Sequence, residues 1–467
     1  MTQPRQLSLF DATMLVMGGI IGVGIFFNPA EIARAVPSEG AYLAMWALGA
    51  LAAMSGAMTF AELSAAFPRV GGWYVWLREA FGSMAAFLFA WVVLLVVSTG
   101  ACALVAQFFA AQVGELFLTP LPPPETAAAV TDAAAQVDYR VVGIAAGVVV
   151  FVTALALMGL KSGAIFQNLC MFMKLGAVGT FIVTGLALYG GVPAAETVAA
   201  ADITSSSLPK GMLAASLSVL FSYGGWQLLS YIAPSVKDAQ KNLPKAIVFG
   251  VSGVAVIYLL INVAYLKVLG IGGIASGDGP PMAVRMANAA LGEGVGATFV
   301  TAAMAVSALG FLVATLITTP GIYVAMSREG LFFRSFGQLH ATTGAPVLAL
   351  LSQCLLALGY IAWSVGDRAF VESLTGAVVF AEWIFHGMAG LALIVLVKRA
   401  GTERPYKSPF FPLFPVMYVA IAVAVVIGNL ATTLTGEDPR VSLIGVTVLA
   451  LGAGVYKLLP RRALTGE

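Results

Sequence analysis

The sequence predicts an all-α polytopic membrane protein with twelve transmembrane helices, arranged as two inverted five-helix repeats followed by two further helices. Three observations carry this prediction. Hydrophobic residues make up 60% of the 467 residues and charged residues only 10%, unlike the composition of soluble domains. Apolar runs long enough to cross a bilayer recur along the chain. Two of these runs are interrupted by glycine clusters, one in each half.

Twelve apolar runs are close to the roughly 20 residues that a spanning helix needs. Two of them are longer than one perpendicular crossing, which indicates tilted helices or an additional turn. The runs are 10–35, 41–67, 80–115, 140–159, 164–190, 211–234, 246–270, 294–327, 346–364, 371–397, 412–432 and 441–459.

The distribution of basic residues predicts the orientation. With the N-terminus in the cytoplasm, most of the 24 Lys and Arg residues fall in the two tails and in the connections 68–79, 160–163, 235–245, 328–345 and 398–411. This bias predicts an even number of spans with both termini in the cytoplasm. The polar N-terminal segment shows no small-residue cleavage site, so we interpret it as a tail. Compact loops favour a bacterial inner membrane.

The first span contains the sequence Met17-Gly18-Gly19-Ile20-Ile21-Gly22-Val23-Gly24-Ile25-Phe26-Phe27-Asn28-Pro29. Glycine costs about 1 kcal/mol relative to alanine inside a helix, so four glycines predict a helix break. A second cluster, Phe221-Ser222-Tyr223-Gly224-Gly225-Trp226-Gln227, interrupts the sixth span. Broken spans at matching positions in two halves indicate a transporter binding site. The structural alternative is that the glycines only allow close helix packing.

The position of the two breaks defines the predicted repeat. Five spans precede the second break, and an odd number of spans per repeat places the second copy upside down in the membrane. The predicted units are residues 1–195, residues 205–400, and residues 401–467 with the last two helices and a cytoplasmic tail. Broken backbone is tolerated at membrane depth only where it is buried or lines a cavity. Its N–H groups suit a carboxylate and its carbonyls an ammonium, which together describe an α-amino acid.

These breaks, with several further segments, resemble the amino acid–polyamine–organocation (APC) superfamily, and most closely its L-type amino acid transporter branch and that branch's bacterial relatives. The resemblance extends through nearly all of the first ten spans. It implies the LeuT-type fold and sodium-independent amino acid transport by alternating access. The segments that carry it are 19–26, 60–63, 67–74, 221–226, 237–238, 241–247, 325–330, 343–347 and 404–407.

The resemblance implies a substrate-binding role for eight residues. Backbone N–H groups of residues 22–24 would bind the substrate carboxylate, and carbonyls near Ile20 and Phe221 its ammonium. The Phe221 ring would gate the pocket from outside. Val23 stands where the branch often has serine, which removes a hydroxyl and leaves the substrate range open. The eight residues are Ile20, Gly22, Val23, Gly24, Phe221, Gly224, Trp226 and Gln227, the last two near the substrate side chain.

Lys174 lies inside the fifth span, near mid-bilayer at about 1.5 Å of rise per residue. A charge at that depth is expected to be functional. It resembles the family's lysine that substitutes for a sodium ion by bridging carbonyls of the first span and a hydroxyl of the eighth, for which Ser307 is the candidate. Burial lowers a lysine pKa, so proton release during the cycle is a second role. The structural alternative is a lysine that snorkels to the interface.

The remaining ionisable residues in the spans receive weaker predictions. Glu62, just before a basic inner connection, is interpreted as structural. Glu382 either hydrogen-bonds within the bundle or takes part in coupling, and the structural role is favoured, as it is for His386. The two histidines and three cysteines show no metal-ligand spacing, so no metal or cofactor is expected. No nucleic-acid partner is expected either. Residues 116–139 contain no cysteine, which excludes the disulfide-linked partner subunit of the animal L-type proteins.

Competing functions are separated by what the spans contain. A cationic amino acid or polyamine would need an acidic partner, and the first, third, sixth and eighth spans offer none at membrane depth, which favours neutral amino acids. A membrane enzyme would need a nucleophile–base pair, and no convincing spacing is present. A receptor would need a soluble module, and no loop is long enough. Paired breaks suit an occluded site better than a channel. An exchanger and a proton-coupled symporter both remain open.

Overall fold

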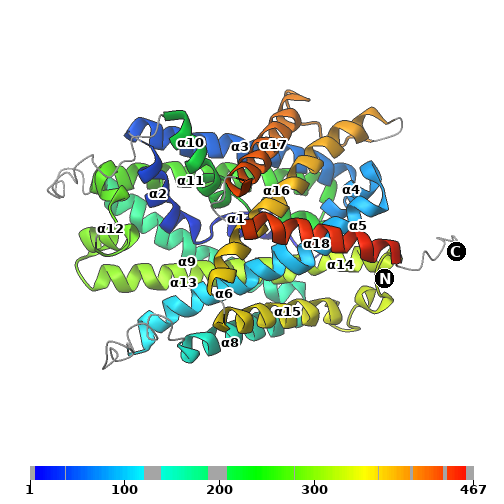
Figure 1. Ribbon diagram of the computed structural model, residues 1–467, viewed down its shortest axis with the longest axis horizontal. Coiled ribbons are helices and arrows are strands. Elements are labelled where there is room, and N and C mark those ends of the chain that lie inside the picture. The colour runs from blue at the N-terminus through cyan, green and yellow to red at the C-terminus, as the bar shows by residue number, and fades with distance from the viewer. Residues whose placement is uncertain are drawn as a thin grey trace.

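The computed structural model describes residues 6–36, 38–119, 138–187, 208–277, 279–366, 368–399, 403–434 and 439–458. Within these ranges the named elements are all helices, joined by non-helical connections (Figure 1). The elements are α1 (Leu9–Ile20), α2 (Gly24–Ala35), α3 (Glu39–Ala66), α4 (Trp73–Phe81), α5 (Ser83–Val92), η1 (Val93–Val97), α6 (Ser98–Phe117), α8 (Tyr139–Leu157), α9 (Leu160–Ala187), α10 (Leu208–Ser222), η3 (Trp226–Ser235), α11 (Ala239–Ala275), α12 (Met282–Leu291), α13 (Val295–Thr318), α14 (Pro320–Arg328), η4 (Arg334–Gly337), α15 (Val347–Gly366), α16 (Arg368–Lys398), α17 (Leu413–Leu434) and α18 (Pro439–Leu458).

Apolar helices occupy all twelve predicted span positions. Among the described residues, nine segments are individually long and apolar enough to cross a membrane. Helices α1 and α2 form a further span that is bent by 42° at its break. Two shorter apolar segments, Leu413–Gly428 and Gly445–Leu458, stand at the last two predicted positions. The long third run is one segment, Ser83–Phe117, which contains the π-helical turn η1. The predicted class of polytopic all-α membrane protein is therefore confirmed.

The first span breaks where its glycines predict. Helix α1 begins with a capping box in which Ser8 and Asp11 satisfy each other's backbone N–H groups. It ends at Ile20, and Ile21 has a non-helical backbone with ψ of 86°. The N–H of Gly22 then turns back to the carbonyl of Ile20 at 2.7 Å. This hydrogen bond engages the Ile20 carbonyl within the break, and α2 then starts in a new direction.

The second break contacts the first through backbone. Helix α10 ends at Ser222, and the 3-10 helix η3 begins at Trp226 after Gly225, whose φ of 121° is rarely adopted by residues with a side chain. A Cβ on Gly225 would overlap the carbonyl of Gly19. A Cβ on Gly19 would lie 2.8 Å from the carbonyl oxygen of Gly225. Glycines in these clusters therefore both interrupt the helices and allow the two breaks to approach closely.

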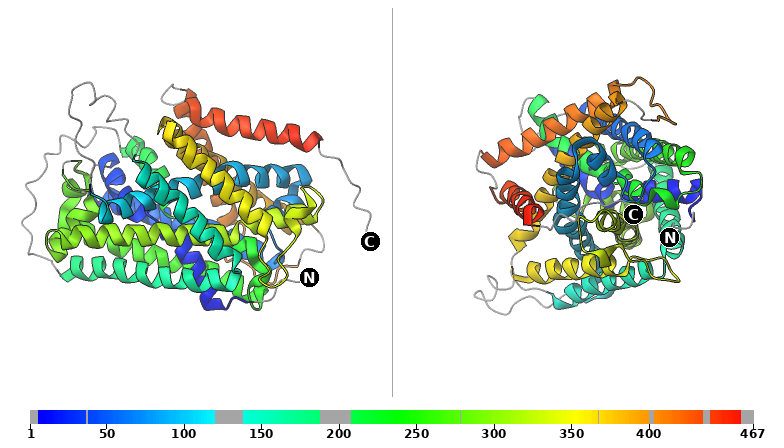
Figure 2. Two further views of the ribbon diagram at one scale, coloured as in Figure 1. Left: turned by 90° about the horizontal axis from the view of Figure 1, so that it is seen from below. Right: turned by 90° about the vertical axis from the view of Figure 1, so that its right-hand side faces the viewer.

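Helices at equivalent positions of the two predicted repeats pack against each other. Helix α3 packs on α11, α6 on α13, and α8 on α15. Two halves related by a two-fold axis would bring equivalent helices together in this way, and the division into repeats stays a prediction. The predicted boundary at residues 195–205 lies outside the described residues. Helices α17 and α18 pack against α16, with α18 on the outside of the bundle (Figure 2).

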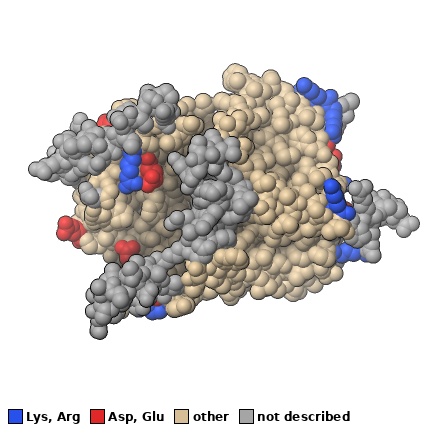
Figure 3. Space-filling model, in the orientation of Figure 1, with Lys and Arg blue, Asp and Glu red and all other residues tan. Residues whose placement is uncertain are grey.

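Charged side chains gather at the two ends of the long axis. Figure 3 shows Lys and Arg at both ends, including the end where N and C are marked in Figure 1, and the visible acidic surface mostly at the opposite end. Apolar surface separates the two ends. Large apolar side chains on the spans, such as Phe151, Leu169 and Leu355, are at least half exposed. An apolar belt of this kind is what the hydrocarbon core of a bilayer requires.

Candidate functional site

A cavity of about 270 Å³ lies where the two broken spans meet. Its volume is close to the lower limit of the roughly 300–1,000 Å³ of small-molecule sites. Its walls come from the two broken spans, from η1, α6, α13 and α16, and from Thr319 between α13 and α14. The structure therefore brings the two halves of the chain together at one site. The cavity is lined by all eight residues for which the resemblance implies substrate binding, Ile20, Gly22, Val23, Gly24, Phe221, Gly224, Trp226 and Gln227.

The start of α2 lines the cavity. Val23 is the N-cap of this helix, and no side chain caps it. The first N–H groups of a helix have no partner within the helix, and the helix dipole adds positive potential at this end. A Cβ on Gly22 would meet nothing closer than 3.9 Å, so space remains in front of the backbone. This end of α2 is chemically suited to a carboxylate.

The carbonyls expected to hold an ammonium are not equally available. The Ile20 carbonyl accepts from the N–H of Gly22 and also from the hydroxyl of Tyr258 at 3.1 Å. Sequence reasoning missed this tyrosine, which α11 supplies. The Phe221 carbonyl accepts only the N–H of Gly224, at 3.2 Å, among the bonds described for it. Because a carbonyl oxygen has two lone pairs, Phe221 keeps a better acceptor position than Ile20.

The side chains after the second break differ in their surroundings. The Phe221 ring lines the cavity and is 47% exposed. The Trp226 ring is buried, and its Nε1 has no hydrogen-bond partner among the described residues. The Gln227 side chain is bound at both ends of its amide. Its Oε1 accepts from the N–H of Gly225 at 2.9 Å, and its Nε2 donates to Glu382. Gln227 is therefore a fixed part of the wall.

Lys174 lies behind the first break and points into the bundle. Its side chain is buried, and Nζ donates to the carbonyls of Gly18 at 3.0 Å and Ile21 at 2.6 Å. The hydroxyl of Ser307 on α13 donates to the same Ile21 carbonyl at 3.3 Å. The geometry therefore contradicts the snorkelling alternative. An ammonium here also meets the negative end of the α1 dipole.

Gly310 makes room for this lysine. A Cβ on Gly310 would lie 2.7 Å from Cε and 2.9 Å from Nζ of Lys174. Helix α13 thus contributes Ser307 and, one turn away, a glycine that admits the ammonium. Sequence reasoning identified Ser307 and missed Gly310. A glycine three residues after the candidate serine, on the same helix face, was the available signal.

A carboxylate that sequence reasoning left without a firm role also lines the cavity. Glu382, on α16, accepts a hydrogen bond from Nε2 of Gln227 at 2.7 Å. Nε2 of His386 lies 3.9 Å from the same carboxylate oxygen. The other ring nitrogen of His386 hydrogen-bonds to the hydroxyl of Tyr418, on α17. Helix α16 is therefore hydrogen-bonded to the second break through Glu382 and to α17 through His386.

Glu62 has a different environment. Its carboxylate pairs with Arg404 at 2.5 Å and accepts from the N–H and hydroxyl of Ser408 at 3.0 and 2.8 Å. These partners lie in the connection before α17, as expected for a structural carboxylate. Among the described residues, no group of three His, Cys, Asp or Glu side chains could hold a metal ion.

The beginning of α1 is attached to the end of η3. The N–H groups of Gln6 and Leu7 donate to the carbonyl of Ser235 at 2.9 and 3.0 Å. In return, the N–H of Lys237 donates to the carbonyl of Leu7 at 2.9 Å. These backbone bonds join the start of the first broken span to the end of the second.

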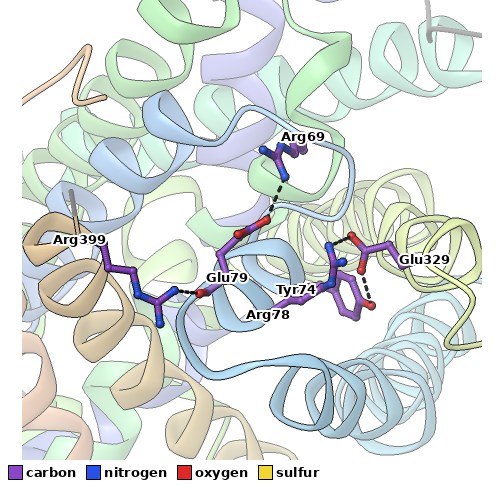
Figure 4. Close-up of polar contacts among 6 residues, drawn as sticks. All are labelled: Arg69, Tyr74, Arg78, Glu79, Glu329 and Arg399. Carbon is purple, nitrogen blue, oxygen red and sulfur yellow. Dashed lines mark hydrogen bonds and ion pairs between the residues drawn. The ribbon is translucent and has the colours of Figure 1, made fainter. Parts of the chain in front are cut away.

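Six residues form a second polar network at this end, shown in Figure 4: Arg69, Tyr74, Arg78, Glu79, Glu329 and Arg399. Arg78 pairs with Glu329 at 2.6 Å, and the hydroxyl of Tyr74 donates to the other carboxylate oxygen at 2.8 Å. Arg399 donates to the backbone carbonyl of Glu79, whose carboxylate pairs with Arg69. The network attaches α4 to the ends of α14 and α16.

Comparison with known proteins agrees with this geometry. The chain is 28% identical over 424 residues to the b(0,+)-type amino acid transporter 1 of Mus musculus, covering 91% of this chain and 82% of that protein. It is 28% identical over 457 residues to the serine/threonine exchanger SteT of Bacillus subtilis, covering 97% of each. It is 28% identical over 465 residues to the large neutral amino acids transporter small subunit 2 of Oryctolagus cuniculus, covering 97% and 80%.

The family signature extends over nearly the whole chain. The profile described as amino acid permease matches residues 7–449, which include both broken spans, Lys174, helix α17 and the first half of α18. On this evidence the chain belongs to the amino acid permease family.

Proposed function

We propose that this protein is a sodium-independent secondary transporter that carries α-amino acids, neutral L-amino acids among them, by alternating access. One observation supports this most strongly. The first break offers uncapped N–H groups to the cavity on one side, while the buried ammonium of Lys174 binds its carbonyls on the other. As a member of a permease family the chain is a transporter and not an enzyme.

Substrate binding follows from the two breaks. The N–H groups of residues 22–24 bind the substrate carboxylate at the start of α2. The ammonium binds the carbonyl of Phe221, because Tyr258 already occupies Ile20. The side chain then extends toward Trp226 and Gln227. This arrangement makes the α-amino acid group the common element of all substrates.

Lys174 takes the place of a sodium ion. Its Nζ binds two carbonyls of the first break as a cation would, and Ser307 adds a hydroxyl to one of them. Because the cation is covalently part of α9, the arrangement of the first break does not depend on external sodium. This is the physical basis for sodium independence.

The structure corresponds to a state closed on its basic side. The bonds between the start of α1 and the end of η3, and the network in Figure 4, hold that side together. Phe221, in the cavity wall, is half exposed. Opening to the basic side requires release of the bonds at Leu7. From the predicted bias of Lys and Arg we infer that this side and both termini face the cytoplasm. We propose a bacterial inner membrane as the setting, with lipid around the apolar belt and no disulfide-linked subunit.

A cationic amino acid carrier is the second candidate. It is favoured by one observation, the carboxylate of Glu382 in the cavity wall. Glu382 lies on the tenth span, outside the four spans in which no acid was found at membrane depth.

Uptake into proteoliposomes tests the proposal. Radiolabelled leucine uptake is measured with and without sodium, internal amino acid and a pH gradient, for the native protein and Lys174→Ala. Lys161→Ala, which removes an exposed lysine from the same helix α9, is the control. We expect saturable sodium-independent uptake that falls about tenfold or more in Lys174→Ala, because a partner of two charge-assisted hydrogen bonds is lost. Lys161→Ala should stay within about twofold of the native rate.

The same experiment shows what drives amino acid uptake. A requirement for internal amino acid identifies an exchanger, and a requirement for the pH gradient identifies a proton symporter. Uptake that needs sodium and survives Lys174→Ala would contradict the assignment of the lysine.

A further inference from the structure

Asn28 connects two half-helices by hydrogen bonds: α2, which follows the first break, and α10, which precedes the second. Its Nδ2 donates to the hydroxyl oxygen of Ser222 at 2.7 Å and to the carbonyl oxygen of Ser218 at 2.9 Å. The Ser222 hydroxyl donates to the same Ser218 carbonyl at 2.8 Å. In the described part of the chain, Asn28 provides every hydrogen bond between α2 and α10. One side chain therefore joins the two half-helices.

Gly24, one turn before Asn28 on α2, allows this close approach. A Cβ on Gly24 would lie 3.1 Å from both Nδ2 of Asn28 and Oγ of Ser222, and 3.3 Å from Cα of Ser222. Ser222 is itself buried. An asparagine amide has two N–H donors, and here each has an acceptor on α10. Because the side chain is short and both donors are engaged, it holds the half-helices at one separation.

The residues that Asn28 connects adjoin both parts of the proposed substrate site. Gly24, four residues earlier on the same helix face, supplies one of the N–H groups proposed for the substrate carboxylate. Ser222 directly follows Phe221, whose carbonyl is proposed for the ammonium. Gly24, Phe221 and Ser222 line the cavity, and Asn28 lies behind that lining. Asn28 therefore acts on a substrate only through the residues that it holds in place.

The separation of these half-helices limits which amino acids can bind with both charged groups. One carbon joins the ammonium and the carboxylate of an α-amino acid, and two carbons join those of a β-amino acid. The second carbon lengthens the distance from the nitrogen to the carboxyl carbon by about 1.3 Å in the extended form. Good hydrogen bonds span a range of donor–acceptor distances of only about 0.5 Å. Half-helices at a fixed separation therefore leave one group of a β-amino acid poorly bound.

From these observations we propose that Asn28 is a positioning residue that fixes the distance between the carboxylate site on α2 and the ammonium site on α10. The cavity is thereby restricted to amino acids whose two charged groups share one carbon. This inference rests on the proposed function, since it concerns the backbone of the same substrate. It is independent of the substrate side chain, because Asn28 affects the binding of all α-amino acids alike.

Competition for uptake in proteoliposomes tests this role. Uptake of radiolabelled leucine gives the KM for leucine. Its inhibition by β-homoleucine gives the Ki for an amino acid with the same side chain and one additional backbone carbon. Both values are measured for the native protein and for Asn28→Ala. Ser216→Ala is the control, because it removes a hydroxyl of α10 that donates only within its own helix, to the carbonyl of Leu213 at 2.6 Å.

The expected result is a loss of preference for the α-amino acid. The native protein should bind leucine at least about tenfold more tightly than β-homoleucine, because only leucine satisfies both sites. In Asn28→Ala the KM for leucine should rise about fivefold or more, since two hydrogen bonds that hold the site are lost. The KM for alanine should rise by the same factor, and the Ki for β-homoleucine should stay within about twofold of the native value. Ser216→Ala should change none of these values.

Each other outcome has a defined meaning. Saturable leucine uptake by the native protein, with β-homoleucine bound equally well, overturns the positioning role and leaves the proposed function standing. An equal loss of affinity for both compounds in Asn28→Ala, or a lower maximal rate with an unchanged preference, assigns Asn28 to stability or to gating and overturns the inference. No saturable uptake of leucine or alanine by the native protein contradicts the proposed function itself.

The substitution Asn28→Gln tests the distance directly. Glutamine keeps both N–H donors and places them one methylene group farther from α2. If these bonds hold the half-helices apart at a set distance, the Ki for β-homoleucine should fall below its native value while the KM for leucine rises. Native values of both constants in Asn28→Gln would overturn the inference.

A further variant covers the case in which the substitutions of Asn28 do not fold. Ser222→Ala removes one of the two acceptors and leaves the Ser218 carbonyl in place. The preference for leucine over β-homoleucine should fall in this variant, because the amide of Asn28 is then held by one hydrogen bond instead of two. A folded Ser222→Ala protein with the native preference would overturn the inference.

Discussion

The contact between the two breaks can be tested with the substitution Gly225→Ala. Gly225 has φ of 121°, and an alanine Cβ would overlap the carbonyl of Gly19. Backbone held in a sparsely populated region costs about 1–3 kcal/mol. Overpacking adds about 1–3 kcal/mol, and the opposing atoms are backbone that cannot rotate away. The variant should therefore be destabilised by about 2–6 kcal/mol in total.

Gly147→Ala is the matched control for this substitution. Gly147 is exposed on α8, and a Cβ there would meet no atom within 4 Å. Because alanine is favoured over glycine by about 1 kcal/mol within a helix, this change should leave the melting temperature equal or slightly higher.

Thermal unfolding of both variants in the same detergent, followed by leucine uptake, provides the measurement. Gly225→Ala should melt well below the native protein and Gly147→Ala, and uptake should be lost with it. If Gly225→Ala melts with the native protein and transports at the native rate, the two breaks do not depend on this backbone contact, and our account of the site is wrong.

Two further predictions concern the residues that support the site. Ser307→Ala removes one hydroxyl from the Ile21 carbonyl, worth about 0.5–1.5 kcal/mol, so sodium-independent uptake should fall about two- to tenfold, less than in Lys174→Ala; an effect as large as that of Lys174→Ala would contradict the supporting role. Glu62→Gln should lower stability by about 1.5–3 kcal/mol in thermal unfolding, because the charge-assisted bond to Arg404 is lost; equal melting of the variant and the native protein would refute the structural role.

The fold and the location of the site are accessible from the sequence for local reasons. A membrane span requires a continuous apolar run, and a break requires residues that destabilise a helix. Both features therefore depend on residues that are neighbours in the chain. Lys174 is identifiable because a charge in an apolar run is too costly to be accidental. The twelve span positions and both breaks agree with the structure.

Other features depend on which helix face meets which neighbour. Glu382 lies in a long apolar helix, and its distance from Gln227, 155 residues earlier in the chain, cannot be inferred from periodicity. The same holds for the Tyr258 hydroxyl that occupies the Ile20 carbonyl, and for Gly310 beside Lys174. In a helix that is apolar on all sides, the buried face is not marked by the sequence pattern.

By itself, the sequence determined that this chain crosses a membrane many times, breaks two of its helices and places a lysine beside the first break. Only the tertiary structure decided which backbone groups remain available and that a carboxylate faces the cavity. The physical reason is that helix formation and bilayer insertion are local, whereas the charge balance of the cavity is set by packing between helices that are distant in the chain.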